Sequence, residues 1–301
     1  TAVTPITGEN QIESFNINTG GQCFYFGNLS FSRYHHTTCA NSNRGLFAGG
    51  ATSSPTSSDV IDYITIASEG NALDFGDLVS ARREMAALSN SVRGVFIAGF
   101  STPSTSLSPD KDLVIIASQG NATDFGNMHS SSTARSAGCA SPTRGVFAGG
   151  YTNPTTAIDT IEYITIQTTG SPATNFGNLT IGRKLHAGCS NAIRGVFGGG
   201  VDPGNTKLSS VDYITIASAG NALDFGDLTL NREQIAACAG SNRGIFGGGD
   251  ANPVASHSTV MDYVTIPTLG NAFDFGVLRT PSTFGGYNSM AGLSNGHGGL
   301  S

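Results

Sequence analysis

The strongest constraint on the fold is a repeat that runs along the chain with a period of 49 to 51 residues. Self-similarity at such a period is typical of repeat architectures. An Arg-Gly-apolar-Phe sequence followed by small residues occurs five times, at 44–50, 93–99, 144–150, 194–200 and 243–249. An acidic residue before alternating apolar positions occurs six times, at Glu13, Asp62, Asp112, Glu162, Asp212 and Asp262. The sequence Phe-Gly-Xaa-Leu/Met also occurs six times, at Phe26, Phe75, Phe125, Phe176, Phe225 and Phe275.

Each repeat contains four short segments of β-branched, aromatic and glycine residues, separated by turn residues. In the first repeat we expect strands near 37–41 and at 45–50, 61–67 and 74–78. No segment shows helical periodicity, and 41 glycines with only 12% charged residues also disfavour a helical protein. Units of this length with four antiparallel strands are typical of propeller blades. The sequence therefore predicts an all-β, six-bladed β-propeller.

The two ends of the chain are predicted to build the last blade together. Aligning residues 293–301 on 39–47 puts the last residue midway through a second strand, whereas Ile12 aligns with a third strand. We therefore expect residues 282–301 to supply the first two strands of this blade and residues 11–29 the last two. Such closure removes the open seam of a ring. The single predicted domain, 1–301, has blades at about 33–78, 82–128, 133–179, 183–228, 232–278, and 282–301 plus 11–29.

Taken together, these features resemble the kelch repeat over essentially the whole chain. The resemblance rests on Arg33 before the first strand, the pair Gly49-Gly50 ending the second, an acidic-Xaa-aromatic sequence in the third and an aromatic in the fourth. Kelch repeats usually carry Trp in the fourth strand, where this chain has Phe75 and its equivalents. The second repeat also replaces the glycine pair by Gly99-Phe100. The amino-acid sequence of the repeats is similar to that of kelch-type propeller proteins of marine bacteriophages, especially cyanophages.

Charge and hydropathy exclude two classes of partner. The net charge is -6 and no run of Lys or Arg occurs, so nucleic acid is not an expected partner. The longest apolar stretches have the length of a strand, and residues 1–10 lack the basic and apolar regions of a signal peptide. We therefore expect no membrane insertion. Thr1 is compatible with removal of either an initiator Met or a signal.

Cysteine and histidine positions predict neither disulfides nor a metal site. Four of the five cysteines occupy one first-strand position in different repeats, too far apart for a disulfide, and read as small buried residues. Cys23 is unmatched and expected to be free. This usage fits synthesis in a reducing compartment. His36 and His186 lie three blades apart and cannot share one zinc ion, and no cofactor is predicted.

The arginine of each Arg-Gly sequence has an apparent partner at the start of the fourth strand. Arg44, Arg93, Arg144, Arg194 and Arg243 are matched by Asp74, Asp124, Asn175, Asp224 and Asp274. The sixth repeat has Gly298 and Tyr25 instead, so it lacks both members. We therefore expect a structural link within each blade. The four Asp-Phe-Gly triplets are also expected to be structural, because a catalytic aspartate is not repeated around a ring.

Candidate ligand-binding residues lie where the repeats differ. In an antiparallel meander, the turns after the second and fourth strands emerge on one face, and variable loops on a rigid scaffold are where recognition usually sits. If the first strand is innermost, arginines in front of it would surround the channel mouth and bind carboxylate or phosphate groups. The alternative is that they tie turns to backbone carbonyls. The candidates are Arg33, Arg82, Arg135, Arg183, Arg232, Tyr151, Asn153, Asn205 and Asn252.

The predicted function is a non-enzymatic binding or structural module. The phage resemblance implies a virion component, such as a tail fibre, adhesin or capsid decoration, at the virion surface or outside the cell. Its partners would be host-surface glycan or other virion proteins. One alternative is a carbohydrate-active enzyme, which needs two converging carboxyls, yet the non-repeating acids Glu84, Asp110, Glu233 and Asp250 lie in different blades. Another is an intracellular kelch-type adaptor. The sequence does not set the oligomeric state.

Overall fold

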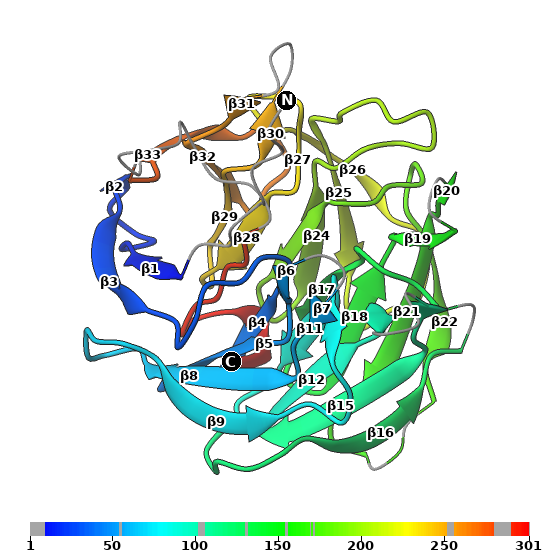
Figure 1. The fold of residues 1–301 in the computed structure, drawn as a ribbon. Coiled ribbons are helices and arrows are strands. Elements are labelled where there is room, and N and C mark those ends of the chain that lie inside the picture. Colours follow the sequence, from blue (N-terminus) through cyan, green and yellow to red (C-terminus); the bar gives the residue numbers. More distant parts are fainter. Residues whose placement is uncertain are drawn as a thin grey trace, which may run out of the picture.

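The computed structural model describes residues 10–53, 56–101, 106–129, 132–153, 156–168, 170, 172–251, 256–279 and 290–300. Within these residues the chain is all-β, as predicted, and its one helical element is the short 3-10 turn η1 (Gly298–Leu300). The sheets are arranged around a common centre (Figure 1). No helix in this part of the chain is long and apolar enough to cross a membrane.

Five repeats each form an antiparallel meander whose four strands pair in sequence order, as the repeat pattern predicts. Unit 1 contains β4 (Thr37–Ala40), β5 (Arg44–Ala48), β8 (Val60–Thr65) and β9 (Leu73–Asp77). Unit 2 contains β11 (Ala86–Ser89), β12 (Arg93–Ile97), β15 (Asp110–Ile115) and β16 (Thr123–Asn127). Unit 3 contains β17 (Ala137–Ala140), β18 (Arg144–Ala148), β21 (Thr160–Thr165) and β22 (Thr174–Asn178).

Unit 4 contains β23 (Ala187–Ser190), β24 (Arg194–Gly198), β25 (Ser210–Thr215) and β26 (Leu223–Asp227), and unit 5 contains β28 (Ala236–Ala239), β29 (Arg243–Gly247), β32 (Val260–Thr265) and β33 (Phe273–Val277). Short strands in the connections form small hairpins: β6 (Ala51–Ser53) with β7 (Thr56–Ser57), and β19 (Tyr151–Asn153) with β20 (Thr156–Ala157). Two three-stranded additions are β10 (Arg82–Arg83), β13 (Phe100–Ser101) and β14 (Ser106–Leu107), and β27 (Arg232–Glu233), β30 (Asp250–Ala251) and β31 (Ser256–His257).

Residues near the N-terminus lie between unit 5 and unit 1. β1 (Gln11–Ser14) pairs antiparallel with β3 (Phe24–Asn28), and β2 (Gly21–Gln22) pairs with β33 of unit 5. On the other side, Gly70 of unit 1 donates its N–H to the carbonyl of Phe26, 2.9 Å away. Figure 1 shows the resulting order, with the blue β3 between β33 and β8. The pair β1–β3 thus has the place of third and fourth strands.

The C-terminal segment, residues 290–300, occupies an inner position between β28 and β4. Thr38 donates its Oγ1 hydroxyl to the carbonyl of Gly292 at 2.8 Å, and Ser294 donates to the carbonyl of Ala239. The side chain of Leu293 packs against Gly45. These contacts correspond to those of the inner strands in other units, although this segment forms no strand. The predicted start of the segment, from 282 to 289, lies outside the described residues.

The expectation of a second strand at the C-terminal end is wrong. Residues 298–300 form η1, which crosses the end of the channel instead of continuing a sheet. Gly298 and Gly299 approach the backbone of Asn191 and Ser89 so closely that a Cβ would overlap with a carbonyl oxygen. His297 fixes this path: its Nε2 lies 2.8 Å from the carbonyl oxygen of Ala40, and its Nδ1 accepts the N–H of Gly299.

A narrow channel runs along the inner strands. Its cavity of about 70 Å³ is lined by equivalent residue triplets from the five units and the C-terminal segment, at 38–40, 87–89, 138–140, 188–190, 237–239 and 292–294. The last residue of these triplets alternates between Ala and Ser around the centre. Ser89 donates its hydroxyl to the carbonyl of Ala40, and Ser190 does the same to Ala140, at 2.8 Å in both cases.

The apolar core lies between neighbouring units. In one cluster, Leu46 and Phe75 of unit 1 pack with Phe96 and Val114 of unit 2. The glycine of each Arg-Gly sequence makes room for a side chain of the preceding unit, since a Cβ on Gly94 would lie 2.6 Å from Cys39 Sγ. All five cysteines are free thiols. Burial raises the pKa of the Cys39 thiol to about 12, which keeps it in the unreactive thiol form.

Candidate functional site

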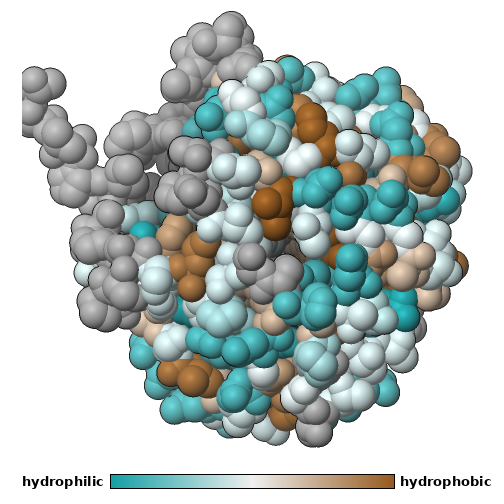
Figure 2. Space-filling model, turned by 90° about the vertical axis from the view of Figure 1, so that its right-hand side faces the viewer, coloured by the Kyte–Doolittle hydropathy of each residue, from teal (hydrophilic) through white to brown (hydrophobic). Residues whose placement is uncertain are grey.

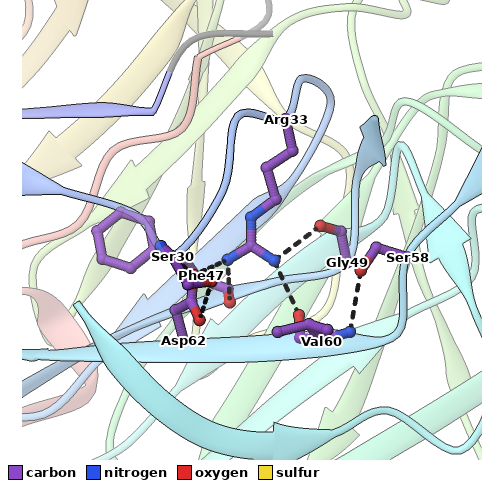
Figure 3. A network of polar contacts seen from close by, with 7 residues as sticks. All are labelled: Ser30, Arg33, Phe47, Gly49, Ser58, Val60 and Asp62. Atoms are coloured by element: carbon purple, nitrogen blue, oxygen red, sulfur yellow. Dashed lines mark hydrogen bonds and ion pairs between the residues drawn. The ribbon is translucent and has the colours of Figure 1, made fainter. Parts of the chain in front are cut away.

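The expected arginine ring lies inside the units and not at the channel mouth. The side chain of Arg33 is fully buried, and its Nη2 forms an ion pair of 2.8 Å with Asp62 in β8. Its Nη1 donates to the carbonyls of Val60 and Gly49, and Nη2 donates to that of Phe47 (Figure 3). Burial lowers the pKa of the Arg33 guanidinium, and the Asp62 charge opposes this shift.

Three further units repeat this arrangement. Their buried ion pairs are Arg82–Asp112 at 2.6 Å, Arg183–Asp212 at 2.9 Å and Arg232–Asp262 at 2.5 Å. The expectation that these four arginines are available to a ligand is therefore wrong, and their role is to tie turns and carbonyls to the third strand. The physical reason is that the acid of the third strand is itself buried and needs a cation.

The same acids also hold the chain that enters each unit. Ser30 donates both its N–H and its hydroxyl to Asp62, and Thr180 does so to Asp212. Figure 3 shows Ser30 and Arg33 meeting at Asp62. Each buried acid thus connects the end of one unit to the sheet of the next. The connections that carry the loops are therefore fixed to the core.

Unit 3 differs from these four units in the residues near the buried acid of its third strand. Thr133 stands at the position of Arg33, so Glu162 has no arginine from its own unit. The buried Lys111 of unit 2 replaces an isoleucine of the repeat, and its Nζ donates to the carbonyl of Asn127 at 2.8 Å. Burial lowers the pKa of its ammonium group to about 8, while the Glu162 carboxylate raises it. Arg135, which the sequence grouped with the other arginines, lies two positions further along.

The arginines of the Arg-Gly sequences also differ from expectation. Arg44 does not pair with Asp74 of its own unit. Its Nη1 donates to the carbonyls of Ile116 and Ala117 in unit 2, at 3.2 and 2.9 Å, and its guanidinium lies 4.8 Å from the ring centre of Tyr63. Equivalent bonds link each unit to the next, and Arg243 of unit 5 reaches Asn18 at 2.9 Å. The link therefore runs between units.

Five residues at one end of the channel form a ring that we call the mouth ring. They lie two positions before the inner strands and have left-handed backbone conformations with φ between 56° and 60°: His35, Glu84, Arg135, Leu185 and Gln234. Each of the last four donates its N–H to the carbonyl of the previous member, so that Glu84 bonds to His35 at 3.0 Å and Gln234 to Leu185 at 2.8 Å. Non-glycine residues in this conformation are strained and concentrate at functional sites.

Side chains of the mouth ring form one polar cluster. Arg135 holds Glu84 with two hydrogen bonds, from Nε to Oε2 at 2.6 Å and from Nη2 to Oε1 at 2.8 Å. The hydroxyl of Tyr151 donates to Glu84 Oε2 at 3.3 Å, and His35 Nε2 lies 3.8 Å from Oε1. Phe100 packs against Tyr151 with ring centres 5.7 Å apart. Lys184 of unit 4 lies 5.7 Å from the Tyr151 ring centre. The cluster around the Glu84 carboxylate therefore contains residues from four units.

Electrostatics keep this cluster in one charge state near neutral pH. Burial opposes ionisation of Glu84, but the hydrogen bonds and charge of Arg135 lower the pKa of its carboxyl below the ordinary value. Burial lowers the pKa of His35 to about 4, although Glu84 acts in the opposite direction. Burial raises the pKa of Tyr151 far above its ordinary value. His35 is therefore neutral while Glu84 and Arg135 are charged.

The remaining candidates do not join this cluster. Asn205 has a left-handed conformation in a turn where its N–H bonds to the carbonyl of Asp202. Asn153 ends β19, and Asn252 lies outside the described residues. Sequence reasoning missed His35, Glu84, Leu185 and Gln234. The available signal was a position that differs in every repeat, two residues after the conserved first-strand arginine or Thr133.

The acids expected to reveal an enzyme each have a polar partner. Glu84 is held by Arg135, and Glu233 lies 3.4 Å from Lys207 Nζ. Asp110 accepts the hydroxyl of Ser108. Glu84, the acid of this group that lies in the mouth ring, is thus bound by a cation and not paired with a second carboxyl. Nor do three or more His, Cys, Asp or Glu side chains gather among the described residues in a way that could hold a metal ion.

Comparison with known proteins supports the fold. No family model matches the chain, and no curated protein matches its sequence. Among 417 matching chains of solved structures is YjhT, with a TM-score of 0.69 and 10% identity over 87% of this chain and 96% of that chain. At this identity the likeness concerns the fold alone and transfers no activity. The chain shares with YjhT an all-β architecture that fits a β-propeller.

Proposed function

We propose that the chain is a six-bladed kelch-like β-propeller that acts as a binding module and not as an enzyme. The sixth blade would consist of the pair β1–β3 and the C-terminal segment, closing a single domain of residues 1–301. Two contacts support this closure. Arg243 bonds to Asn18 as the other arginines bond to the next unit, and Leu293 packs on Gly45 as Cys39 packs on Gly94.

The mouth ring is the proposed recognition site. The observation that carries this proposal is that five strained positions, linked by backbone hydrogen bonds, bear five different side chains on an otherwise repetitive scaffold. Fixing these positions in advance reduces the entropy lost on binding. Of the residues expected from the sequence, Arg135 and Tyr151 belong to this site. Binding would take place on the ring, because η1 and His297 cover the opposite end of the channel.

We further propose that the module belongs to a phage virion, as a tail fibre, adhesin or capsid decoration, and contacts host-surface glycan or another virion protein. The similarity of the repeats to those of marine phage proteins supports this role. The surface agrees with recognition through polar contacts. Hydrophobic residues on the face in Figure 2 form small separate groups among hydrophilic ones, whereas permanent interfaces usually bury a broad apolar patch.

Two measurements test this proposal. Mass spectrometry of purified phage particles and of infected-cell fractions should find the protein in the particle; its restriction to cell fractions would refute the virion role. Incubation of the purified protein with a panel of oligosaccharides, followed by mass spectrometry, should leave every saccharide unchanged. Cleavage or isomerisation of any of them would establish an enzyme instead of a binding module.

A further inference from the structure

The guanidinium of Arg135 is held on one edge and open on another. Nε and Nη2 are fixed side-on by Glu84, whose side chain is only 5% exposed. The Arg135 side chain is 28% exposed. Among the residues that the structure describes, Nη1 donates no hydrogen bond to the protein. Nη1 and the second N–H of Nη2 together form a planar pair of donors that points away from Glu84.

This donor pair is rigid before any ligand arrives. Glu84 cannot turn away easily, because the hydroxyl of Tyr151 also bonds to it and its backbone is fixed in the mouth ring. The Tyr151 ring centre lies 5.7 Å from the Arg135 guanidinium carbon. A carboxylate and an aromatic ring thus support the guanidinium from two sides. A fixed planar pair of donors selects a ligand with two acceptor oxygens at adjacent positions.

The positive charge of Arg135 itself is balanced within the mouth ring. Glu84 neutralises the guanidinium directly, and the Glu233 carboxylate also acts on it, as the raised pKa of Arg135 shows after the opposing effect of burial. The whole chain carries a net charge of -6. An anion at this edge would therefore meet a guanidinium whose own charge is already balanced, whereas the other cations nearby, Lys184 and Arg83, lie against the rings of Tyr151 and Phe100. Neutral oxygen atoms accept hydrogen bonds from the same donors without this cost.

We infer that the mouth ring binds a neutral saccharide and that Arg135 donates to two vicinal hydroxyl oxygens of one sugar ring. This inference rests on the proposed binding function and names its ligand class. The next members of the ring extend the contact: Leu185 offers an aliphatic surface, and Gln234 carries an amide. Sugar rings have such alternating apolar and hydroxyl-bearing parts. Arg135 is thus the specificity-determining residue of the site.

The test uses a glycan array followed by calorimetry on the full chain. Neutral oligosaccharides should bind, and their affinity should change less than about twofold between about 50 mM and 500 mM NaCl, because no net charge is neutralised. Arg135→Lys keeps the charge but loses the planar donor pair, and should weaken binding by about tenfold or more. Arg194→Lys, at the opposite end of the channel, is the matched control and should bind like the wild type.

Several results would overturn the inference. Unchanged binding by Arg135→Lys, exclusive binding of acidic sugars with strong salt dependence, or no binding to the array would each do so. Thermal unfolding of both variants guards against a folding defect. If Arg135→Lys is unstable, Gln234→Ala replaces it, with a loss of affinity supporting the inference and unchanged affinity contradicting it. The particle measurement is independent, so the virion role can stand while this ligand assignment fails.

Discussion

Lys111 of unit 2 and Glu162 of unit 3 are electrically coupled across the boundary between their units. The lysine replaces the isoleucine that the repeat places in β8 and β21, and Thr133 replaces the arginine that the repeat places before the inner strand. Burial lowers the pKa of Lys111 to about 8, and Glu162 counteracts it. Two substitutions thus coincide: unit 3 lacks the arginine of the repeat, and the neighbouring unit places a buried cation whose charge acts favourably on Glu162.

The first prediction is that a stability loss caused by replacing Lys111 can be recovered by restoring the arginine at position 133. Lys111→Ile should lower the free energy of unfolding by about 1 to 3 kcal/mol, because the carbonyl of Asn127 loses its donor and Glu162 loses a favourable charge interaction. Adding Thr133→Arg should recover most of this loss by restoring the arrangement of unit 1. Urea unfolding of the two single variants and the double variant measures the coupling. A double variant no more stable than Lys111→Ile would contradict this prediction.

A second prediction concerns the buried arginines. Arg183→Met should destabilise the protein by about 3 to 5 kcal/mol, since Asp212 remains buried and loses its ion pair of 2.9 Å. Combined replacement of Arg82, Arg183 and Arg232 should therefore unfold the chain. Circular dichroism during heating measures both effects. A triple variant with wild-type stability would show that these pairs are dispensable.

A third prediction follows from a buried histidine. His186 is only 6% exposed, and burial together with the charge of Arg183 lowers its pKa to about 3. The unfolded chain has a higher pKa, so it binds the proton first as the pH falls. The contribution of neutral His186 to the free energy of unfolding should be fully present above about pH 6.5. It should decrease below this pH, by about 2 kcal/mol at pH 5.

His186→Met provides the test, because Met85 occupies the equivalent position in unit 2. Urea unfolding at pH 7.5 and pH 5 should show a smaller loss of stability for this variant than for the wild type. His129→Gln, which removes an exposed histidine, is the control and should retain the wild-type pH dependence. Equal pH dependence of all three proteins would refute the assignment to His186.

A fourth prediction concerns the packing between units. A Cβ on Gly94 would lie 2.6 Å from Cys39 Sγ, so Gly94→Ala should destabilise the protein by about 1 to 3 kcal/mol through overpacking. Cys39→Ala in the same chain removes the sulfur and should restore part of the stability. Thermal denaturation of the single and double variants measures this. If Cys39→Ala lowers the stability of the Gly94→Ala protein as much as it lowers that of the wild type, the proposed overlap is refuted.

The strands could be predicted from the sequence because they depend on local features. Alternating apolar residues and the turn residues between them recur in every unit, and the predicted meander is present in five of them. The partners of the arginines could not be predicted in this way. Arg33 binds Asp62 within its unit, whereas Arg44 binds carbonyls of the next unit. Both have an acid at a constant spacing in sequence, and only the packing of the sheets distinguishes them.

The mouth ring was hidden for a related reason. Its members are defined by a backbone conformation and by hydrogen bonds between units, and neither leaves a residue type in common. The absence of both Arg and Asp from the sixth repeat also suggested a pairing that does not exist. Joint loss at Gly298 and Tyr25 instead reflects a terminal segment that forms η1, where no arginine is needed.

The alternation of alanine and serine along the channel sets a rule for changing the size of the ring. Each hydroxyl is used by one neighbour, from Ser89 to Ala40, from Ser190 to Ala140 and from Ser294 to Ala239. The inner positions of the channel are thus grouped in three couples, the last of which joins unit 5 to the C-terminal segment. Removing one sheet would set two hydroxyls or two methyl groups side by side, whereas removing a couple would preserve every bond. Growth or shrinkage of this architecture is therefore expected in steps of two.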